Sequence, residues 1–273
     1  HKLRSLLTML GVVFGVGSVI AMLAVGEGAS QEALAQIRKL GSHNILINAQ
    51  KPAEEQTSAN VRVRMSVYGL LYKDVGRIQG SFPTVKRAVP VKIVSKEGRL
   101  GAKTMDLRVV GTSPTWFDLV KRPLIAGRTI ASQDMESRGS VAVLTEHGAR
   151  RLLATHAAIG QTLRIGGSYF EVIGIVRSEG GSGSGMQAPD KETDVYIPIE
   201  VARERYGDIF MQRQSGTQIR EMVQLHQIIV EVDDLVNVES TAAAIERMLE
   251  FYHKKKDYAI SVPLALLRQA EAT

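Results

Sequence analysis

An uncharged apolar run over residues 6–25 constrains this sequence more than any other feature. Only Thr8 and Ser18 are polar within it, and as an α-helix the run spans about 30 Å, the thickness of the hydrocarbon core of a bilayer. The alternative is a secretory signal peptide, whose apolar core is about 7–15 residues long and ends at a small-residue cleavage site. Because the run is longer and continues into a helix-like segment, we expect a transmembrane helix over residues 1–26.

The flanking charges predict how this helix is oriented. Lys2 and Arg4 precede the run, whereas Glu27 and Glu32 are the first charges after it. Cationic flanks favour the cytoplasmic side, so we expect a cytoplasmic N-terminus and a periplasmic or extracellular location for everything after about residue 26. The sequence begins with His rather than Met, and we therefore expect a piece of a longer protein in which this span need not be the only one.

Two glycines within the run predict a helix-packing face. Gly11 and Gly15 form a G-x-x-x-G pair, and glycines at this spacing let a second helix approach closely. The alternative is that glycine is simply common in membrane helices, which gives the pair no specific role.

The segment over residues 27–41 predicts a stalk that continues the membrane helix. Gly41 stands where helices commonly end. A separate surface helix after a break at Gly26 and Gly28 is the alternative, although a glycine costs only about 1 kcal/mol in a helix. The apolar residues that repeat at helical spacing, and that we expect to couple motion along the stalk, are Ala29, Ala33, Leu34, Ile37 and Leu40.

Beyond the stalk, apolar periods of two and of 3.6 residues alternate, which predicts an α+β class. Residues 178–190 and 209–221 are polar or Gly/Ser-rich and predict mobile loops, and residues 118–124 predict a loop or short turn. Gly166 and Gly167 predict a hairpin turn, and Thr145 a helix cap. The expected strands are 44–48, 85–95, 105–111, 140–144, 162–165, 169–176, 195–197, 227–232 and 258–262, and the expected helices are 72–79, 145–153, 200–206 and 237–252.

The sequence offers no catalytic, cofactor-binding or metal-binding constellation. It has no Cys, which excludes thiol chemistry, and it has no phosphate-binding G-x-x-x-x-G-K-[ST] loop and no G-x-S-x-G nucleophile motif. We therefore expect neither an enzyme nor a nucleotide site, and the net charge of +6 is too small and too dispersed to indicate nucleic acid. The histidines lack metal-ligand spacing and are expected at the surface or at helix caps: His43, His147, His156, His226 and His253.

The order of short motifs resembles the permeases of macrolide-exporter-type (MacB-type) ABC transporters. The motifs are K-L-R-S-L-L-T-M-L-G at 2–11, S-V-I-A-M-L-A-V-G-E-G-A at 18–29, V-G-T-S-P-T-W-F at 110–117, A-G-R-T-I at 126–130, S-V-A-V-L at 140–144, I-G-Q-T-L-R-I-G-G at 159–167, F-E-V-I-G-I at 170–175 and V-Y-I-P at 195–198. They follow the family order along nearly the whole chain.

The resemblance implies a two-lobed extracytoplasmic core between the first two membrane helices of a permease. One lobe is split between residues 42–111 and 223–263, in βαβ-type halves, and a second mixed α/β lobe over 112–222 is inserted into it. Residues 264–273 then form a helix that returns towards the membrane.

The resemblance also implies function and partners. The chain is expected to be a permease subunit or fragment in the bacterial inner (plasma) membrane, driven by an ABC ATPase domain or subunit and coupling its motion to export of cargo. A homodimer or permease pair, a periplasmic adaptor and an outer-membrane duct are the further expected partners. Cargo export, lipoprotein extraction and a regulatory role all remain open. The alternative from another class is a single-span ligand-sensing or adhesion ectodomain.

Overall fold

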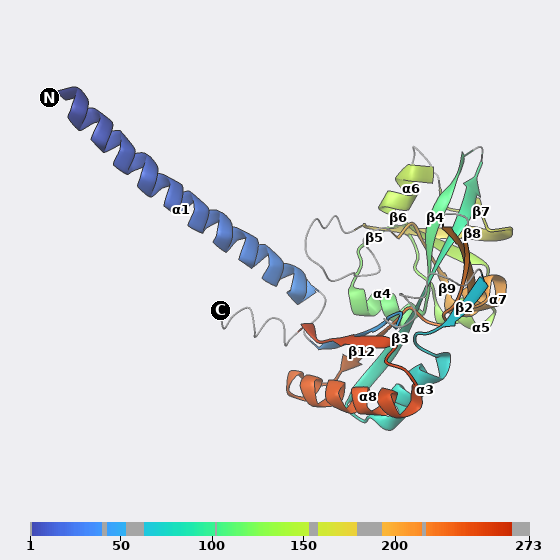
Figure 1. The fold of residues 1–273 in the computed structure, drawn as a ribbon. Coiled ribbons are helices and arrows are strands. Elements are labelled where there is room, and N and C mark those ends of the chain that lie inside the picture. Colours follow the sequence, from blue (N-terminus) through green and yellow to red (C-terminus); the bar gives the residue numbers. More distant parts are fainter. Residues whose placement is uncertain are drawn as a thin grey trace.

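The computed structural model describes residues 2–39, 43–52, 63–101, 103–152, 158–178, 193–214 and 217–263. It consists of one long N-terminal helix, α1 (Lys2–Lys39), that projects from a mixed α/β body (Figure 1). At 1.5 Å per residue this helix is about 57 Å long. The apolar run and the segment after it therefore form one continuous helix, and no break occurs at Gly26 or Gly28.

The body is built on a ten-stranded sheet with the strand order β13-β1-β12-β3-β4-β9-β6-β8-β5, in which β7 pairs with both β3 and β8. The strands of this sheet are β1 (Asn44–Ala49), β3 (Val85–Leu100), β4 (Lys103–Thr112), β5 (Leu124–Gly127), β6 (Val141–Thr145), β7 (Thr162–Ile165), β8 (Ser168–Val176), β9 (Val195–Pro198), β12 (Gln227–Val232) and β13 (Tyr258–Ser261).

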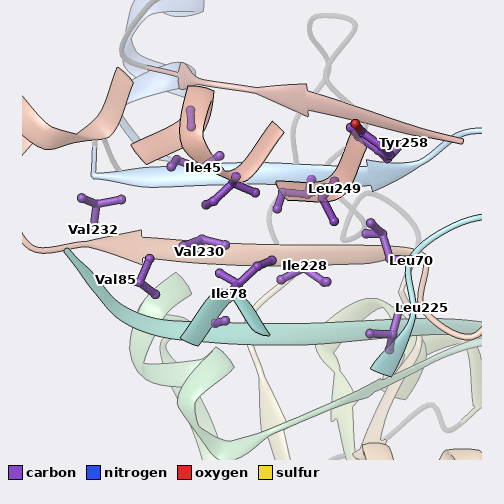
Figure 2. Close-up of a cluster of buried hydrophobic side chains, with 14 of the residues drawn as sticks. Ile45, Leu70, Ile78, Val85, Leu225, Ile228, Val230, Val232, Leu249 and Tyr258 are labelled. Atoms are coloured by element: carbon purple, nitrogen blue, oxygen red, sulfur yellow. The ribbon is translucent and has the colours of Figure 1, made fainter. Parts of the chain in front are cut away.

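Two interleaved βαβ units form one end of the sheet. The first is β1, α3 (Tyr72–Ser81) and β3, and the second is β12, α8 (Val238–Tyr252) and β13, preceded by the short helix η1 (Leu235–Asn237). The four strands lie side by side and are all antiparallel to their neighbours. Apolar side chains from both helices and from one face of these strands make the first core, which includes Ile45, Ile78, Val230 and Leu249 (Figure 2).

The other end of the sheet closes on itself. Because β7 pairs with both β3 and β8, the strands β3, β4, β9, β6, β8 and β7 form a ring. A second buried cluster, which includes Leu107, Leu144, Leu163 and Phe170, fills this end. The 16-residue β3 belongs to both ends, so it is the strand that joins them.

A third buried apolar cluster lies on the face of the sheet opposite the first core, and it also connects the two ends of the sheet. Trp116 and Phe117 of α4 (Pro114–Val120) pack with Leu46 and Val89 from one end and Tyr196 from the other. The prediction of a loop or turn at 118–124 is wrong in its first part, since α4 extends to Val120. Pro114 at the first helical position and burial of the two aromatic rings stabilise this short helix.

A separate three-stranded sheet contradicts the second predicted loop. In this part of the chain β10 (Ile209–Gln214) and β11 (Thr217–Met222) pair with each other antiparallel, and β11 pairs in parallel with β2 (Val63–Val67). The strand β2 was not predicted from the sequence. Because β11 is polar, it has no hydrophobic periodicity that would predict a strand. The backbone of β2 provides its hydrogen-bond partners, and this pairing makes the segment a strand.

The remaining expected elements agree with the structure within a few residues. The β7–β8 hairpin turns at Gly166 and Gly167, which both have positive φ. The Thr145 hydroxyl accepts a hydrogen bond from the Gly148 amide at 2.9 Å, as expected for the cap of α6 (Glu146–Leu152). Helix α7 (Ile199–Tyr206) matches the helix expected at 200–206, whereas α5 (Ser132–Glu136) and the strand β5 were not predicted.

The expected lobe boundaries stay a prediction. Nearly all of the loop expected at 178–190, and the returning helix expected at 264–273, lie outside the described residues.

Candidate functional site

The first predicted site, the glycine pair on α1, lies on a bare stretch of helix. A Cβ atom built at Gly11 or Gly15 would meet no other atom within 4 Å. None of the stretch Met9–Gly26 is buried against the body, and it is long and apolar enough to cross a membrane. The role of the two glycines in packing against another helix stays a prediction.

The predicted stalk residues lie on the same helix. Ala29, Ala33, Leu34 and Ile37 fall within α1, and Leu40 lies outside the described residues. Helix α1 ends at Lys39 and β1 begins at Asn44, so only four residues separate the membrane-length helix from the large sheet. β1 is hydrogen-bonded on both sides, to β12 and to β13. This strand is the direct connection between the helix and the body.

A buried charge cluster ties together the far ends of the two βαβ units. The His253 side chain, which is 4% exposed, places Nε2 3.0 Å from Asp74 Oδ2 and Nδ1 2.8 Å from Asp257 Oδ1. Asp74 also accepts hydrogen bonds from the Leu71 amide and from Arg77, and Asp257 accepts one from the Gly69 amide. The cluster therefore joins the start of α3, the end of α8 and the start of β13.

The two carboxylates set the charge of this imidazole. Hydrogen bonds to Asp257 and then to Asp74 raise the pKa of His253 to about 9, against the opposing effect of burial. Burial acts to raise the pKa of Asp74, but its hydrogen bonds from His253 and Leu71 outweigh burial and hold it below the ordinary value. Both ring nitrogens thus donate, and His253 is an imidazolium at neutral pH.

A second buried charge cluster lies where the three-stranded sheet meets the ten-stranded sheet. Lys92 of β3 is fully buried, and its Nζ lies 2.7 Å from Asp208 Oδ1 and 3.1 Å from the Gln224 carbonyl oxygen. The Tyr72 hydroxyl donates to the same Asp208 oxygen at 3.0 Å. Burial lowers the pKa of Lys92, and the Asp208 carboxylate opposes that effect only in part. This cluster fixes the start of β10 and the β11–β12 connection to the centre of the body.

The expectation that the histidines lie at the surface or at helix caps is wrong for His226, and His156 lies outside the described residues. His253 is the C-cap of α8, as expected, although its side chain is buried between two carboxylates. His226 accepts a hydrogen bond from the Ile93 amide at 3.0 Å, and burial, followed by the Lys92 charge, lowers its pKa to about 4. No spacing signal reveals either case, because the Ile93 partner of His226 and the Asp74 partner of His253 lie 133 and 179 residues away along the chain. Within the described ranges, no group of three His, Cys, Asp or Glu side chains is placed to hold a metal ion.

A membrane-length helix that leads directly into a mixed α/β domain defines a class of membrane-anchored proteins with an extramembrane domain. The family model of the MacB-like periplasmic core domain matches residues 5–248. The chain therefore belongs to the MacB-like periplasmic core domain family, as its motifs predicted.

Relatives align with all or nearly all of the chain. The pyoverdine export ATP-binding/permease protein PvdT of Pseudomonas putida is 30% identical over 274 residues, which cover 100% of this chain and 38% of the relative. The macrolide export ATP-binding/permease protein MacB of Pasteurella multocida is 26% identical over 258 residues, 94% of this chain and 36% of that protein. The chain thus spans less than two fifths of the length of these relatives.

Solved structures share the fold. The periplasmic region of MacB from Actinobacillus actinomycetemcomitans matches with a TM-score of 0.64 at 20% identity, covering 87% of this chain and 96% of that one. The extracellular domain of the noncanonic ABC-type transporter YknZ from Gram-positive bacteria matches with a TM-score of 0.58 at 18% identity, covering 80% and 99%.

Proposed function

We propose that this chain is the first membrane helix and extracytoplasmic domain of an ABC exporter permease. In this proposal an ABC ATPase domain or subunit hydrolyses ATP, and the chain itself binds no nucleotide. Similarity to ATP-binding/permease export proteins over 94–100% of the chain supports it. The same similarity disfavours a single-span sensing or adhesion ectodomain.

The observation that carries the mechanism is the continuity of α1 from Lys2 to Lys39. An unbroken helix transmits a displacement along its axis, whereas a flexible linker would absorb it. In our proposal ATP-driven motion of the membrane span passes along α1 to β1, which is paired on both edges. From there it reaches β12 and then β3, the strand that the two ends of the large sheet share.

Cargo, orientation and partners complete the proposal. The named relatives export macrolides or pyoverdine. We propose that the cargo of this transporter is likewise a small molecule, which the transporter binds on the outer side of the membrane. The N-terminus is cytoplasmic and the body periplasmic or extracellular. The permease works as a homodimer or permease pair, with a periplasmic adaptor and an outer-membrane duct where the cell has an outer membrane.

Orientation is tested by single cysteines, because the sequence contains none of its own. A membrane-impermeant thiol reagent is expected to label Lys254→Cys, at an exposed position, in cells whose outer barrier has been removed. The same reagent is expected to leave Lys2→Cys unlabelled until the inner membrane is opened. The reverse pattern would contradict the exporter orientation.

The lever is tested by a proline in the stalk of the complete transporter. Ala33→Pro removes a backbone hydrogen bond and clashes with the preceding turn, at a cost of about 3 kcal/mol, and so kinks α1. The body has its own cores, so the variant is expected to be produced and to hydrolyse ATP but to lose most export of a macrolide or siderophore from the same cells. Gln36→Ala, a change in the same helix that keeps the backbone intact, is the matched control. Export that survives Ala33→Pro would mean that the stalk is only a tether.

A further inference from the structure

The three-stranded sheet of β2, β10 and β11 presents an apolar face to solvent. Its pairing places Ile209, Met222 and Val67 side by side in one row. The next row along the strands is Met211, Arg220 and Met65. Paired residues of adjacent strands point to the same face, so these six side chains form one surface, which we call the hairpin face.

The hairpin face is exposed although it is rich in apolar side chains. Met211 is 71% exposed, Val67 57%, Ile209 49% and Met65 47%. Outside α1, eleven large apolar residues of the described chain are exposed, and four of them lie here. Methionine supplies three of the six positions, and exposed methionines are typical of surfaces that bind other proteins because the flexible thioether adapts to its partner.

The opposite face of the same sheet is anchored, so the exposure does not reflect a loosely attached hairpin. The Glu221 carboxylate accepts hydrogen bonds from Lys51 at 2.9 Å and from the Tyr68 hydroxyl at 3.0 Å. The Phe210 ring packs edge-on against His226, with 5.4 Å between ring centroids. Just before β10, Asp208 is held by the buried Lys92. The hairpin face is therefore the outer surface of a fixed platform.

Charge decides what kind of partner fits this platform. Arg220 lies on the middle strand between Met211 and Met65 and is exposed. It makes no ion pair with any residue in the described part of the chain. An apolar partner surface that covered Arg220 without a carboxylate would bury an unpaired charge, which is costly.

We propose that the hairpin face is the docking site for a second protein, which places a carboxylate over Arg220 and apolar side chains over the methionines around it. The proposal rests on the proposed function in one respect, that the body lies outside the membrane. Figure 1 shows β2 on the side of the body away from α1, so a protein suits this face better than the lipid around the α1 span.

The test is photocrosslinking in cells that make the full-length transporter. A photoreactive benzophenone amino acid replaces Met211, or Val67 in a second variant, and covalent adducts are identified by mass. We expect an adduct to a distinct protein from both positions and none from Tyr169, a 62% exposed residue on β8. Arg220→Glu is expected to reduce the adduct at least 10-fold and Arg220→Gln less, whereas Arg164→Glu, the matched change of an exposed arginine on β7, should leave it unchanged.

A charge-swap experiment then decides whether the contact is the one proposed. Replacing an Asp or Glu of the crosslinked partner segment by Lys is expected to restore the adduct with the Arg220→Glu variant. An adduct with the mass of two copies of this chain, an adduct to lipid, no adduct, or an adduct that is insensitive to Arg220→Glu would each overturn the proposal. ATP hydrolysis and cargo export of the unmodified transporter, measured in the same cells, report separately on the proposed function.

Discussion

The charged cluster around His253 predicts a specific dependence of stability on pH. His253→Gln removes the imidazolium while leaving the Asp74 and Asp257 carboxylates in place. In the native protein that imidazolium donates to both carboxylates at 3.0 and 2.8 Å and is almost fully buried. The variant therefore loses one cation and leaves two anions facing each other.

The contribution of protonated His253 to the free energy of unfolding follows from the change in its pKa on folding. A pKa of about 9 in the folded chain against an ordinary value of 6.5 corresponds to about 3 kcal/mol, at 1.36 kcal/mol for each pH unit. Folding raises the pKa, so the folded state binds the proton more tightly. The contribution is complete below pH 6.5 and is lost as the pH rises through about 9.

The assay is urea denaturation of the purified chain in detergent, followed by fluorescence of the single tryptophan, Trp116, which is 1% exposed. Urea is preferred to guanidinium because salt screens ion pairs. The wild type should have a higher free energy of unfolding than His253→Gln. We expect this difference between the two proteins to be about 3 kcal/mol larger at pH 6 than at pH 9.5. His43→Gln, which removes an exposed histidine, is the control. A difference between wild type and His253→Gln that does not change with pH would refute the assignment of a buried imidazolium.

Two further changes test other parts of the structure. Lys92→Met leaves the Asp208 carboxylate without its cation, and we expect it to lower the free energy of unfolding by about 3 kcal/mol. The loss is smaller than for a fully buried pair because Asp208 is 20% exposed. The double variant with Asp208→Asn should recover more than half of this loss, and no recovery would mean that the defect lies in packing. Replacing both Gly11 and Gly15 by Leu should crowd the close approach of a second helix and weaken dimer or bundle formation in the full transporter, measured by crosslinking in membranes. Unchanged assembly would leave the glycines without a packing role.

Local sequence was sufficient where a segment carries its own structural information. The membrane-length helix follows from the length of an uncharged run, and its continuation to Lys39 from helical spacing that glycine weakens only slightly. The turn at Gly166 and Gly167 follows from the positive φ that glycine adopts readily. The amphipathic α8 was likewise predictable, because Ile245 and Leu249 recur on one face and are fully buried.

Tertiary structure decided the parts that depend on distant partners. The polar segment 209–221 has no strand period of its own, and it becomes a hairpin beside β2 because residues about 150 positions away complete its hydrogen bonds. The same pairing creates the hairpin face, since it brings Met65 and Val67 next to Arg220 and Met222.

The charge state of His253 was decided in the same way. In sequence this histidine is the first residue of a basic run that ends a helix, where a solvated cation is the simplest interpretation. Folding places Asp74, 179 residues away, against one ring nitrogen, and Asp257 against the other. The sequence determines which helices and strands form wherever hydrophobic periodicity or the length of an apolar run is sufficient to predict them. Which side chains meet, and therefore which charges are buried and which apolar faces stay open, depends on long-range pairing that no local pattern encodes.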